Sequence, residues 1–269
     1  MTDLQVVAAE AFATLNTGRQ VAPFSSRMSS FDLADAYRVT ASVRALRQAR
    51  GETPVGRKIG LTSRTIWSEY NVFAPMWGYM FDRTVHNLAA MGETFSLAGL
   101  AEPRIEPEVV FQLAAAPTPD MDERALLSCI DSVAHGFEIV QSIFPGWVFA
   151  ASDTIAGYGL HGALVVGPWQ SIAADSEEWL RTLSTFEIDL SRNGTIVDHG
   201  RASNVLDGPL PALRHLVDLL ARDPANPALA AGEIVTTGTL TRAFPVAPGE
   251  TWTTAPAGVA LDGISVRFS

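Results

Sequence analysis

Three glutamates stand in apolar surroundings where an ordinary solvated carboxylate is not expected. Glu106 and Glu108 are two residues apart in the run 104–111, so on a strand they project from the same face. Glu138 is the single carboxylate of a second apolar run, 134–141. Carboxylates that are buried or crowded together are costly unless a cation or a proton neutralises them. The alternative for the first pair is a solvated edge strand, in which Pro107 needs no ladder N–H.

If these three carboxylates converge, they form a site made of oxygen ligands alone. Hard cations such as Mg²⁺ and Mn²⁺ prefer oxygen ligands, whereas zinc and copper prefer sites with nitrogen or sulfur. Three protein oxygens leave about three of six octahedral positions open to water or substrate. Because such an open site can act as a Lewis acid, the sequence predicts a magnesium or manganese centre at Glu106, Glu108 and Glu138.

Lys58 lies in a glycine-containing apolar segment, 55–63, that we expect to begin as a strand. A lysine removed from solvent has a lowered pKa and can exchange protons. The alternative is an ordinary surface lysine. Gly56 and Gly60 allow close backbone approach, but they lack the spacing of a phosphate-binding loop, so nucleotide binding is not indicated.

The segment 232–240 is a strand that runs into a cluster of glycine and threonine. Its N–H and O–H groups could donate to a carboxylate, although a strand that ends in an ordinary turn has the same composition. The histidines show no spacing typical of a metal site, and the sequence has no Gly-x-Ser-x-Gly motif of a serine hydrolase.

Strands and helices must position these residues, and their pattern predicts an α+β fold. We expect helices over 4–15 and from Ser29 or Ser30 to Gly51, which together form a helical portion over 1–54. We expect a catalytic mixed-sheet portion over 55–269 that forms one compact unit with it. The expected strands are 55–61, 104–113, 134–140, 162–166, 186–192, 233–238 and 264–268, and the expected later helices are 121–132, 176–184 and 209–222. Asn193-Gly194 predicts a hairpin turn.

The composition excludes several classes of protein. The 269 residues carry 19 Lys+Arg and 29 Asp+Glu, a net charge of −10, which argues against nucleic acid as a partner. One cysteine, Cys129, excludes a disulfide scaffold. No apolar run approaches the ~18 residues of a membrane span, and the N-terminus lacks the pattern of a signal peptide, so we expect a cytoplasmic protein that does not bind membranes.

Taken together, the segments resemble the hydratase and decarboxylase branch of the fumarylacetoacetate hydrolase superfamily, typified by 2-keto-4-pentenoate hydratase. The resemblance covers nearly the whole chain, and its pieces appear in the order of the family. They are Gly56-Arg57-Lys58-Ile59-Gly60-Leu61-Thr62-Ser63, Glu106-Pro107-Glu108-Val109-Val110-Phe111, Phe137-Glu138-Ile139-Val140, Asp153-Thr154-Ile155-Ala156 and Gly232-Glu233-Ile234-Val235-Thr236-Thr237-Gly238-Thr239.

The resemblance implies a mixed sheet rolled into a barrel-like sandwich, with helices outside and usually a homo-oligomeric assembly. It implies that Glu106, Glu108 and Glu138 hold Mg²⁺ or Mn²⁺, to which a small anionic 2-oxo acid is chelated, and that Lys58 donates or accepts a proton near the reacting carbon. The substrate-binding residues that we assign on this resemblance are Arg57, Ser63, Tyr158 and Thr239.

Two departures from the family pattern bear on the reaction. Met76 stands where the family has an acidic residue, and we assign the catalytic role to nearby Asp82 instead. Gly157 and Tyr158 follow 153–156 where the family commonly continues with Asp-Asn, and His161 is a third candidate catalytic residue.

The resemblance favours a metal-dependent hydratase of a small 2-hydroxydienoic or 2-oxo-enoic acid, as used in the breakdown of aromatic compounds. Two enzymatic alternatives keep the same chelation, namely decarboxylation of a 2-oxo-enedioate and hydrolysis of an acylpyruvate C–C bond. A catalytically silent, oligomeric 2-oxo-acid-binding protein is the alternative outside enzymes.

Overall fold

The computed structural model describes residues 3–64, 67–68, 72–92, 94–173 and 175–269. Its helices are α1 (Asp3–Thr14), α2 (Leu33–Ala49), α3 (Leu88–Met91), α4 (Glu123–Ser128), α5 (Ala151–Ala156), α6 (Ser176–Thr182) and α7 (Pro209–Ala221). Its strands are β1 (Pro54–Gly60), β2 (Met76–Phe81), β3 (Val85–Asn87), β4 (Thr94–Phe95), β5 (Arg104–Leu113), β6 (Ile130–Val140), β7 (His161–Ser171), β8 (Glu187–Arg192), β9 (Thr195–Arg201), β10 (Ile234–Thr239), β11 (Phe244–Pro245), β12 (Thr251–Ala257) and β13 (Ser265–Phe268).

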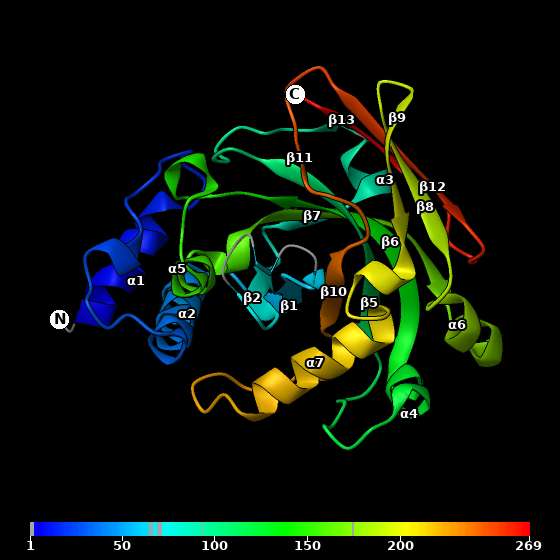
Figure 1. Cartoon of the computed structure of the whole chain (residues 1–269), viewed down its shortest axis with the longest axis horizontal. Helices are drawn as coiled ribbons and strands as arrows, with labels where there is room; N and C mark the ends of the chain where they lie inside the picture. Colours follow the sequence, from blue (N-terminus) through cyan, green and yellow to red (C-terminus); the bar gives the residue numbers. More distant parts are fainter. Residues whose placement is uncertain (1–2, 65–66, 69–71, 93, 174) are drawn as a thin grey trace.

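A large mixed sheet forms the centre of the molecule, with the strand order β2-β1-β10-β5-β6-β7-β3 and with β11 paired to β5. The pairs β1–β10 and β3–β7 are parallel, while β5 pairs antiparallel with both β10 and β6. A second sheet, β4-β13-β12-β8-β9, lies beside it, and the helices lie around the curved sheets (Figure 1). This arrangement confirms the predicted α+β fold with a rolled mixed sheet.

The period-2 alternation of β5 divides its side chains between a core face and an inner face. Val109 and Phe111 join the core cluster that also contains the buried face of α7, and Ile105 packs in a cluster shared with the second sheet. Glu106 and Glu108 alternate with these residues and therefore occupy the inner face. Burial of the apolar side chains on the core face fixes the register, so the carboxylates cannot exchange faces with them.

The N-terminal helices α1 and α2 share an apolar cluster with α5, in which Val7, Val39 and Ile155 are buried. Asp32 caps α2, since its side chain accepts a hydrogen bond from the Asp35 N–H at 2.9 Å. The predicted cap at Ser29 or Ser30 is therefore wrong by two or three residues. The division into portions 1–54 and 55–269 stays a prediction.

Strand pairing corrects one predicted helix boundary. The helix predicted over 121–132 ends at Ser128, because Ile130 begins β6 and pairs with Leu113 of β5. Strand β2 was not predicted at all. Its run is buried at every position and shows no alternation, a pattern that short sequence windows do not distinguish from other buried segments.

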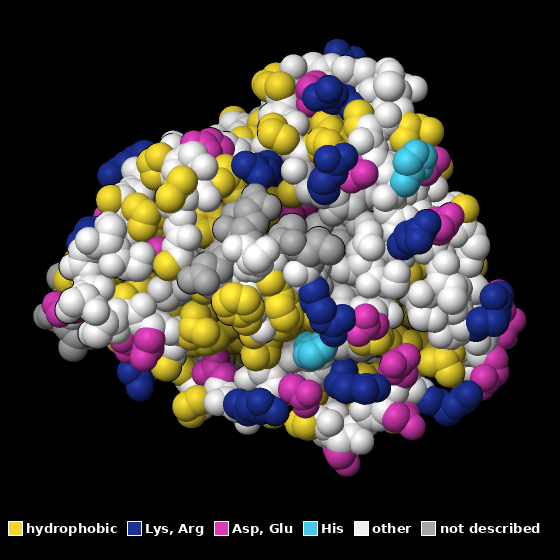
Figure 2. All heavy atoms as spheres, viewed as in Figure 1, with side chains coloured by type: hydrophobic (Ala, Val, Ile, Leu, Met, Phe, Trp, Pro, Cys, Tyr) yellow, Lys and Arg dark blue, Asp and Glu magenta, His cyan; other side chains and the backbone are white. Residues whose placement is uncertain are grey.

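The described helices include none with the length and hydrophobicity needed to cross a bilayer. On the face shown in Figure 2, the described Lys and Arg side chains are interspersed with Asp and Glu and form no continuous basic patch.

Candidate active site

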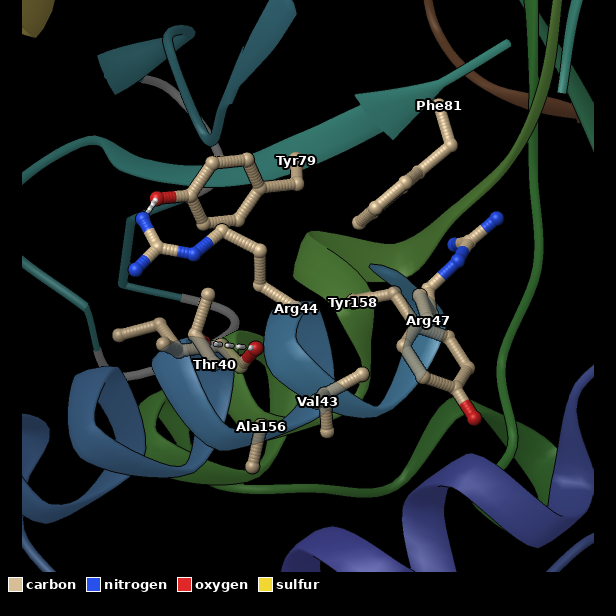
Figure 3. A pocket seen from close by; sticks show the side chains of 9 residues that line it. Thr40, Val43, Arg44, Arg47, Tyr79, Phe81, Ala156 and Tyr158 are labelled. Atoms are coloured by element: carbon tan, nitrogen blue, oxygen red, sulfur yellow. Dashed lines mark hydrogen bonds between the residues drawn. The ribbon is translucent and has the colours of Figure 1, made fainter. Parts of the chain in front are cut away.

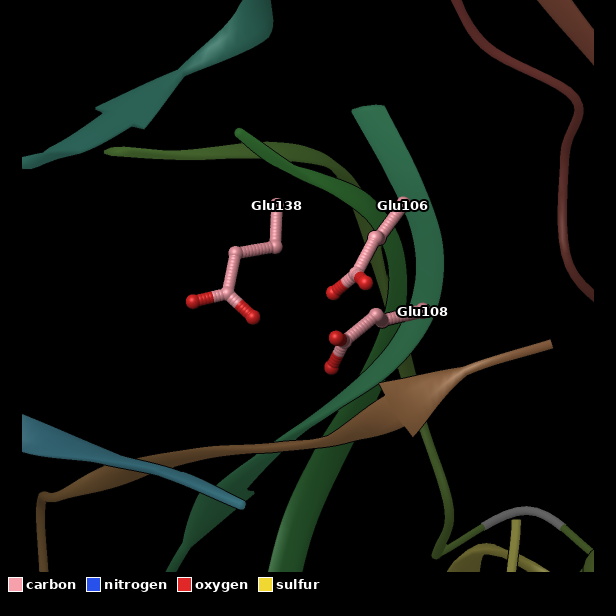
Figure 4. A group of neighbouring side chains, drawn as sticks. All are labelled: Glu106, Glu108 and Glu138. Atoms are coloured by element: carbon pink, nitrogen blue, oxygen red, sulfur yellow. The ribbon is translucent and has the colours of Figure 1, made fainter. Parts of the chain in front are cut away.

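Glu106, Glu108 and Glu138 converge on the inner face of the large sheet. Glu106 on β5 is directly opposite Glu138 on β6, and Glu108 is opposite Gly136. Each carboxylate offers an oxygen within 4.8 Å of the oxygens offered by the other two. Figure 4 shows the three side chains pointing toward one another from the curved strands. Like charges in directly opposed strand positions repel, so this arrangement requires a neutralising partner.

The pKa values of the three glutamates show how their burial and mutual repulsion affect ionisation. Burial, reinforced by Glu138, raises the pKa of Glu106 to about 7. Burial and the neighbouring carboxylates raise the pKa of Glu108 well above its usual value. Burial opposes ionisation of Glu138 as well, but Lys58 and His161 outweigh it and lower the pKa of Glu138 to about 2. The positive charge that the protein places beside the three carboxylates is thus too small to keep all three ionised at once.

Lys58 is buried and lies with its Nζ 3.1 Å from Glu138 Oε2. Gly60 leaves room for this ammonium, because a Cβ there would lie 3.1 Å from Nζ. Burial lowers the pKa of Lys58, but the three glutamates raise it more, and the net direction is upward. The glutamates therefore outweigh desolvation, and Lys58 is a protonated partner of Glu138.

The residues fit a hard divalent cation. Glu108 Oε2 accepts a hydrogen bond from the Gly238 N–H at 2.8 Å, whereas no hydrogen-bond donor of the described chain reaches the buried Glu108 Oε1. Gly238 has φ +98°, and a Cβ there would lie 1.9 Å from the Thr62 hydroxyl oxygen, so only glycine places this N–H against the carboxylate. An unpaired buried carboxylate oxygen beside two further carboxylates matches the oxygen-only ligand set of Mg²⁺ or Mn²⁺.

We expect the affinity for Mg²⁺ to rise steeply between pH 6 and pH 8. Glu106 has a pKa of about 7 in the folded protein, and a ligand must lose its proton before it binds a cation. Between its usual pKa of 4.5 and about 7, folded protein holds a proton that unfolded protein has lost. The metal-free protein should therefore lose stability as the pH rises through that window. Mg²⁺ titration by calorimetry at pH 6 and pH 8 checks the first expectation, and equal affinities at both would contradict it.

His161 holds the Glu138 carboxylate through a hydrogen bond. Its Nδ1 lies 2.8 Å from Glu138 Oε1, and its Nε2 lies 2.9 Å from the Thr84 hydroxyl oxygen. Burial lowers the pKa of His161 against the opposing effect of Glu138, so the neutral ring can donate from Nδ1 to Glu138. His161 is not part of the described cavity lining, and the structure thus favours an orienting role over the predicted catalytic one.

For His161→Ala we expect a 10- to 100-fold weaker affinity for Mg²⁺, the usual effect of removing a side chain that orients a metal ligand. Turnover at saturating Mg²⁺ should be largely retained, because the histidine does not reach the cavity. His215→Ala on α7 is the control and should leave the affinity unchanged. If turnover disappeared at saturating Mg²⁺, the catalytic assignment of His161 would be restored.

A cavity of about 450 Å³ opens beside the glutamates. Lys58, Glu106, Ser63 and Thr239 line it, so these predicted residues are brought together. Thr239 already donates a hydrogen bond to the Thr241 carbonyl at 3.0 Å. The lining also contains residues that we did not predict, among them Thr62, Met76, Arg104, Trp147, Asn204 and Arg242.

The structure does not bring Arg57, Asp82 or Tyr158 to this cavity, and we correct those assignments. The Arg57 side chain alternates with Lys58 to the opposite face, where it pairs with Glu233 at 2.9 Å and lies 3.9 Å from the centre of the Tyr79 ring. Asp82 is exposed beyond the end of β2 and accepts a hydrogen bond from the Thr53 N–H at 3.0 Å. It therefore lies at the opposite end of β1 from Lys58, which pairs with Gly78.

Tyr158 turns away from the glutamates, toward α1. Its hydroxyl lies 2.8 Å from the Thr14 hydroxyl and contacts the Ala11 carbonyl. Its ring lines a separate cavity of only about 20 Å³ beside Arg44 and Arg47 (Figure 3). That space is about the size of one water molecule and cannot admit a 2-oxo acid.

Comparisons with known proteins place the chain in one family. Residues 67–260 match the family described as fumarylacetoacetate (FAA) hydrolase C-terminal. The chain is 28% identical over 254 residues to the 2-hydroxyhexa-2,4-dienoate hydratase of Comamonas testosteroni, covering 93% of each chain. It is 30% identical over 237 residues to the 4-oxalocrotonate decarboxylase of Pseudomonas sp. (strain CF600), covering 87% of this chain and 85% of the relative.

Among solved structures, the 4-oxalocrotonate decarboxylase of Pseudomonas putida G7, complexed with magnesium and adipate, superimposes with a TM-score of 0.88. It shares 26% sequence identity, and the match covers 99% of this chain and 97% of that one. The likeness therefore extends through the N-terminal helices as well as the sheets.

Proposed function

We propose that this chain, which belongs to the fumarylacetoacetate hydrolase family, is a divalent-metal-dependent hydratase of a small 2-hydroxydienoic or 2-oxo-enoic acid. The observation that carries the proposal is the convergence of Glu106, Glu108 and Glu138 beside Lys58, with Glu106 and Lys58 lining a cavity. Relatives named as hydratases support the reaction class, and the magnesium-bound neighbour supports the class of metal. The predicted homo-oligomeric state is part of the proposal and can be measured by light scattering.

Each residue of the site has a distinct part in this proposal. Glu106, Glu108 and Glu138 would hold Mg²⁺ or Mn²⁺, which supplies a Lewis acid for a chelating 2-oxo acid. Addition of water breaks the π bond of the C=C group and one O–H bond of the water, and it forms a C–O bond at one carbon and a C–H bond at the other. One proton must therefore be given to carbon and one taken from water. Lys58 lines the cavity with its Nζ 3.1 Å from Glu138 Oε2, and we assign the C–H proton to it; the proton that water loses would then return to the neutral amine. Ser63 and Thr239 place hydroxyl groups along the same cavity for the polar atoms of the substrate.

Met76 favours a second candidate, decarboxylation of a 2-oxo-enedioate. Hydration needs a group that takes a proton from water, and a thioether cannot do so, whereas loss of CO₂ needs only an electron acceptor and a proton donor. Met76 lines the cavity, and its sulfur accepts a hydrogen bond from the Thr154 hydroxyl. Relatives of the decarboxylase type are as similar to the chain as the hydratases are.

Hydrolysis of an acylpyruvate is less well supported. The Glu–His pair that would activate water is present as Glu138 and His161, but His161 lies behind Glu138 and does not line the described part of the cavity. A water held by His161 would therefore not face a bound carbonyl group.

A substrate screen separates the candidates. The chain with Mg²⁺ or Mn²⁺ would be incubated with 2-hydroxypenta-2,4-dienoate, 2-hydroxyhexa-2,4-dienoate, 2-oxohex-3-enedioate and an acylpyruvate, and the products identified by NMR. We expect a 4-hydroxy-2-oxo acid from a dienoate and no turnover after chelation of the metal. Release of CO₂ alone would replace the hydratase proposal with the decarboxylase. Oxalate binding without any turnover would indicate a silent binding protein.

A further inference from the structure

The side chain of Arg104 is the feature of the cavity that the proposed chemistry does not use. Arg104 is two residues before Glu106 on β5 and therefore projects from the same inner face. Both residues line the cavity. The Arg104 guanidinium lies 4.0 Å from the centre of the Trp147 ring, and no described residue forms a hydrogen bond or ion pair with its side chain.

The other cations of the described cavity lining already have acidic partners. Lys58 is paired with Glu138 at 3.1 Å. Arg242 is paired with Asp198, which accepts from Arg242 Nε at 3.1 Å and from its backbone N–H at 3.0 Å. Arg104 is thus the cation of the described lining that has no hydrogen-bonded acidic partner, and its whole guanidinium edge remains available to an anionic ligand.

The surroundings of Arg104 hold it in place without a hydrogen bond or ion pair from a described residue to its guanidinium, although Glu102 and Glu106 are near enough to interact with its charge. Trp147, on which the guanidinium stacks, is itself fixed by a hydrogen bond from its ring N–H to the Glu102 carbonyl at 3.1 Å. The nearby Glu102 carboxylate accepts from the Gly146 N–H at 3.0 Å and from the Gln20 side chain at 2.9 Å. A stacked arginine with open donors is a geometry suited to bidentate binding of a carboxylate.

We infer that Arg104 binds the second carboxylate of a dicarboxylic 2-oxo acid, at the end of the substrate away from the metal ligands. The inference rests on the proposed function, which places the first carboxylate and the oxo group at the glutamates. Residues two apart on a strand are separated by roughly 7 Å. The five C–C bonds of a six-carbon chain, at about 1.5 Å each in a zigzag, span about 6 Å. A six-carbon diacid therefore has about the length that separates the Glu106 and Arg104 positions along β5.

A matched pair of ligands tests this inference directly. 2-Oxoadipate and 2-oxohexanoate have the same length and the same chelating end, and they differ in the terminal carboxylate. In the presence of Mg²⁺, calorimetry with the unmodified chain should show a preference for 2-oxoadipate of roughly 10- to 100-fold, the range for hydrogen bonds to a charged group. Equal affinities would overturn the inference without any variant.

Two variants test whether Arg104 or Arg242 causes the preference for 2-oxoadipate over 2-oxohexanoate. Arg104→Met keeps an apolar stem on the Trp147 ring and should abolish the preference by weakening 2-oxoadipate alone. Arg242→Gln removes a cation of the same cavity that is already paired, and should retain the preference. Loss of the preference in Arg242→Gln but not in Arg104→Met would overturn the assignment to Arg104.

Oxalate, which has no tail, separates this inference from the proposed function. Mg²⁺-dependent oxalate binding that survives in Arg104→Met shows that the variant is folded and that the chelating end is intact. If Arg104→Met weakened oxalate and both oxo acids by the same factor, Arg104 would act at the metal end and the tail assignment would be wrong. If the unmodified chain bound no oxalate with Mg²⁺, the proposed function would fail and this inference with it.

Discussion

Glu108→Gln should lower metal-dependent turnover by at least about a hundredfold, because it removes one of three ligands and one of the charges that hold the cation. The amide has nearly the shape of the carboxylate and can still accept the hydrogen bond from the Gly238 N–H. We therefore expect the loss to come from the metal and not from a rearranged strand. Mg²⁺ titration by calorimetry, together with turnover on the substrate identified by the screen, measures both effects.

The same variant should make the metal-free protein more stable. Burial and the neighbouring carboxylates raise the pKa of Glu108 above its unfolded value of 4.5. An acid with a raised pKa in the folded state costs stability once the pH rises above the unfolded pKa, and the cost grows until the folded pKa is reached. Gln carries no such cost, so the melting temperature without metal should be higher than that of the parent at pH 8.

Glu177→Gln provides the matched control, since Glu177 is an exposed glutamate whose partner is Arg124 on the surface. It should change neither Mg²⁺ affinity nor turnover. Parental turnover by Glu108→Gln at limiting Mg²⁺ would remove Glu108 from the metal site and, with it, the main support for the proposed function.

The glutamates could be predicted from the sequence because their placement follows from local rules. Period-2 alternation sets Glu106 and Glu108 on one face, and the apolar residues between and around them decide that this face is the inner one. Glu138 is different, because its place opposite Glu106 depends on the pairing of β5 with β6. Only its isolation in an apolar run indicated that it had a charged partner.

The assignments of Asp82, Tyr158 and Arg57 to the cavity were wrong because they depend on where strands run and side chains point. Closeness in the sequence does not give those directions. Asp82 follows Met76 by six residues, but β2 runs antiparallel to β1 and carries Asp82 away from Lys58. Tyr158 lies in a short turn whose backbone packs against Gly78 while its ring points to α1. Arg57 could have been excluded by the same alternation that places Lys58 in the cavity, since adjacent strand residues face opposite sides.

Two further features of the sequence indicate residues of the site. Lys58 is the only lysine of the chain, among 19 cationic residues. Arginine serves every other cationic position, so a lysine at this one indicates a task for which a guanidinium, which does not release its proton, is unsuitable. Arg104 stands two residues before Glu106, and the same-face rule applied to the glutamates would also have placed it in the cavity.

Lys58→Met should abolish most turnover, by about 10²- to 10⁴-fold, the usual contribution of a positioned proton donor. Binding of Mg²⁺ should persist and become tighter, because the variant removes a positive charge 3.1 Å from Glu138 and leaves the three carboxylates in place. Without metal, the variant should be less stable than the parent, since buried Glu138 loses its ammonium partner. Added Mg²⁺ should restore most of that stability.

The combination of lost turnover with tighter Mg²⁺ binding is what separates a proton donor from a structural lysine. Lys58→Arg is the matched control, because it keeps the positive charge beside Glu138 but does not release a proton at neutral pH. It should preserve the stability of the metal-free protein and still lack turnover. If Lys58→Met kept full turnover on the identified substrate, Lys58 would serve only to neutralise Glu138, and the proton would have to come from elsewhere in the cavity.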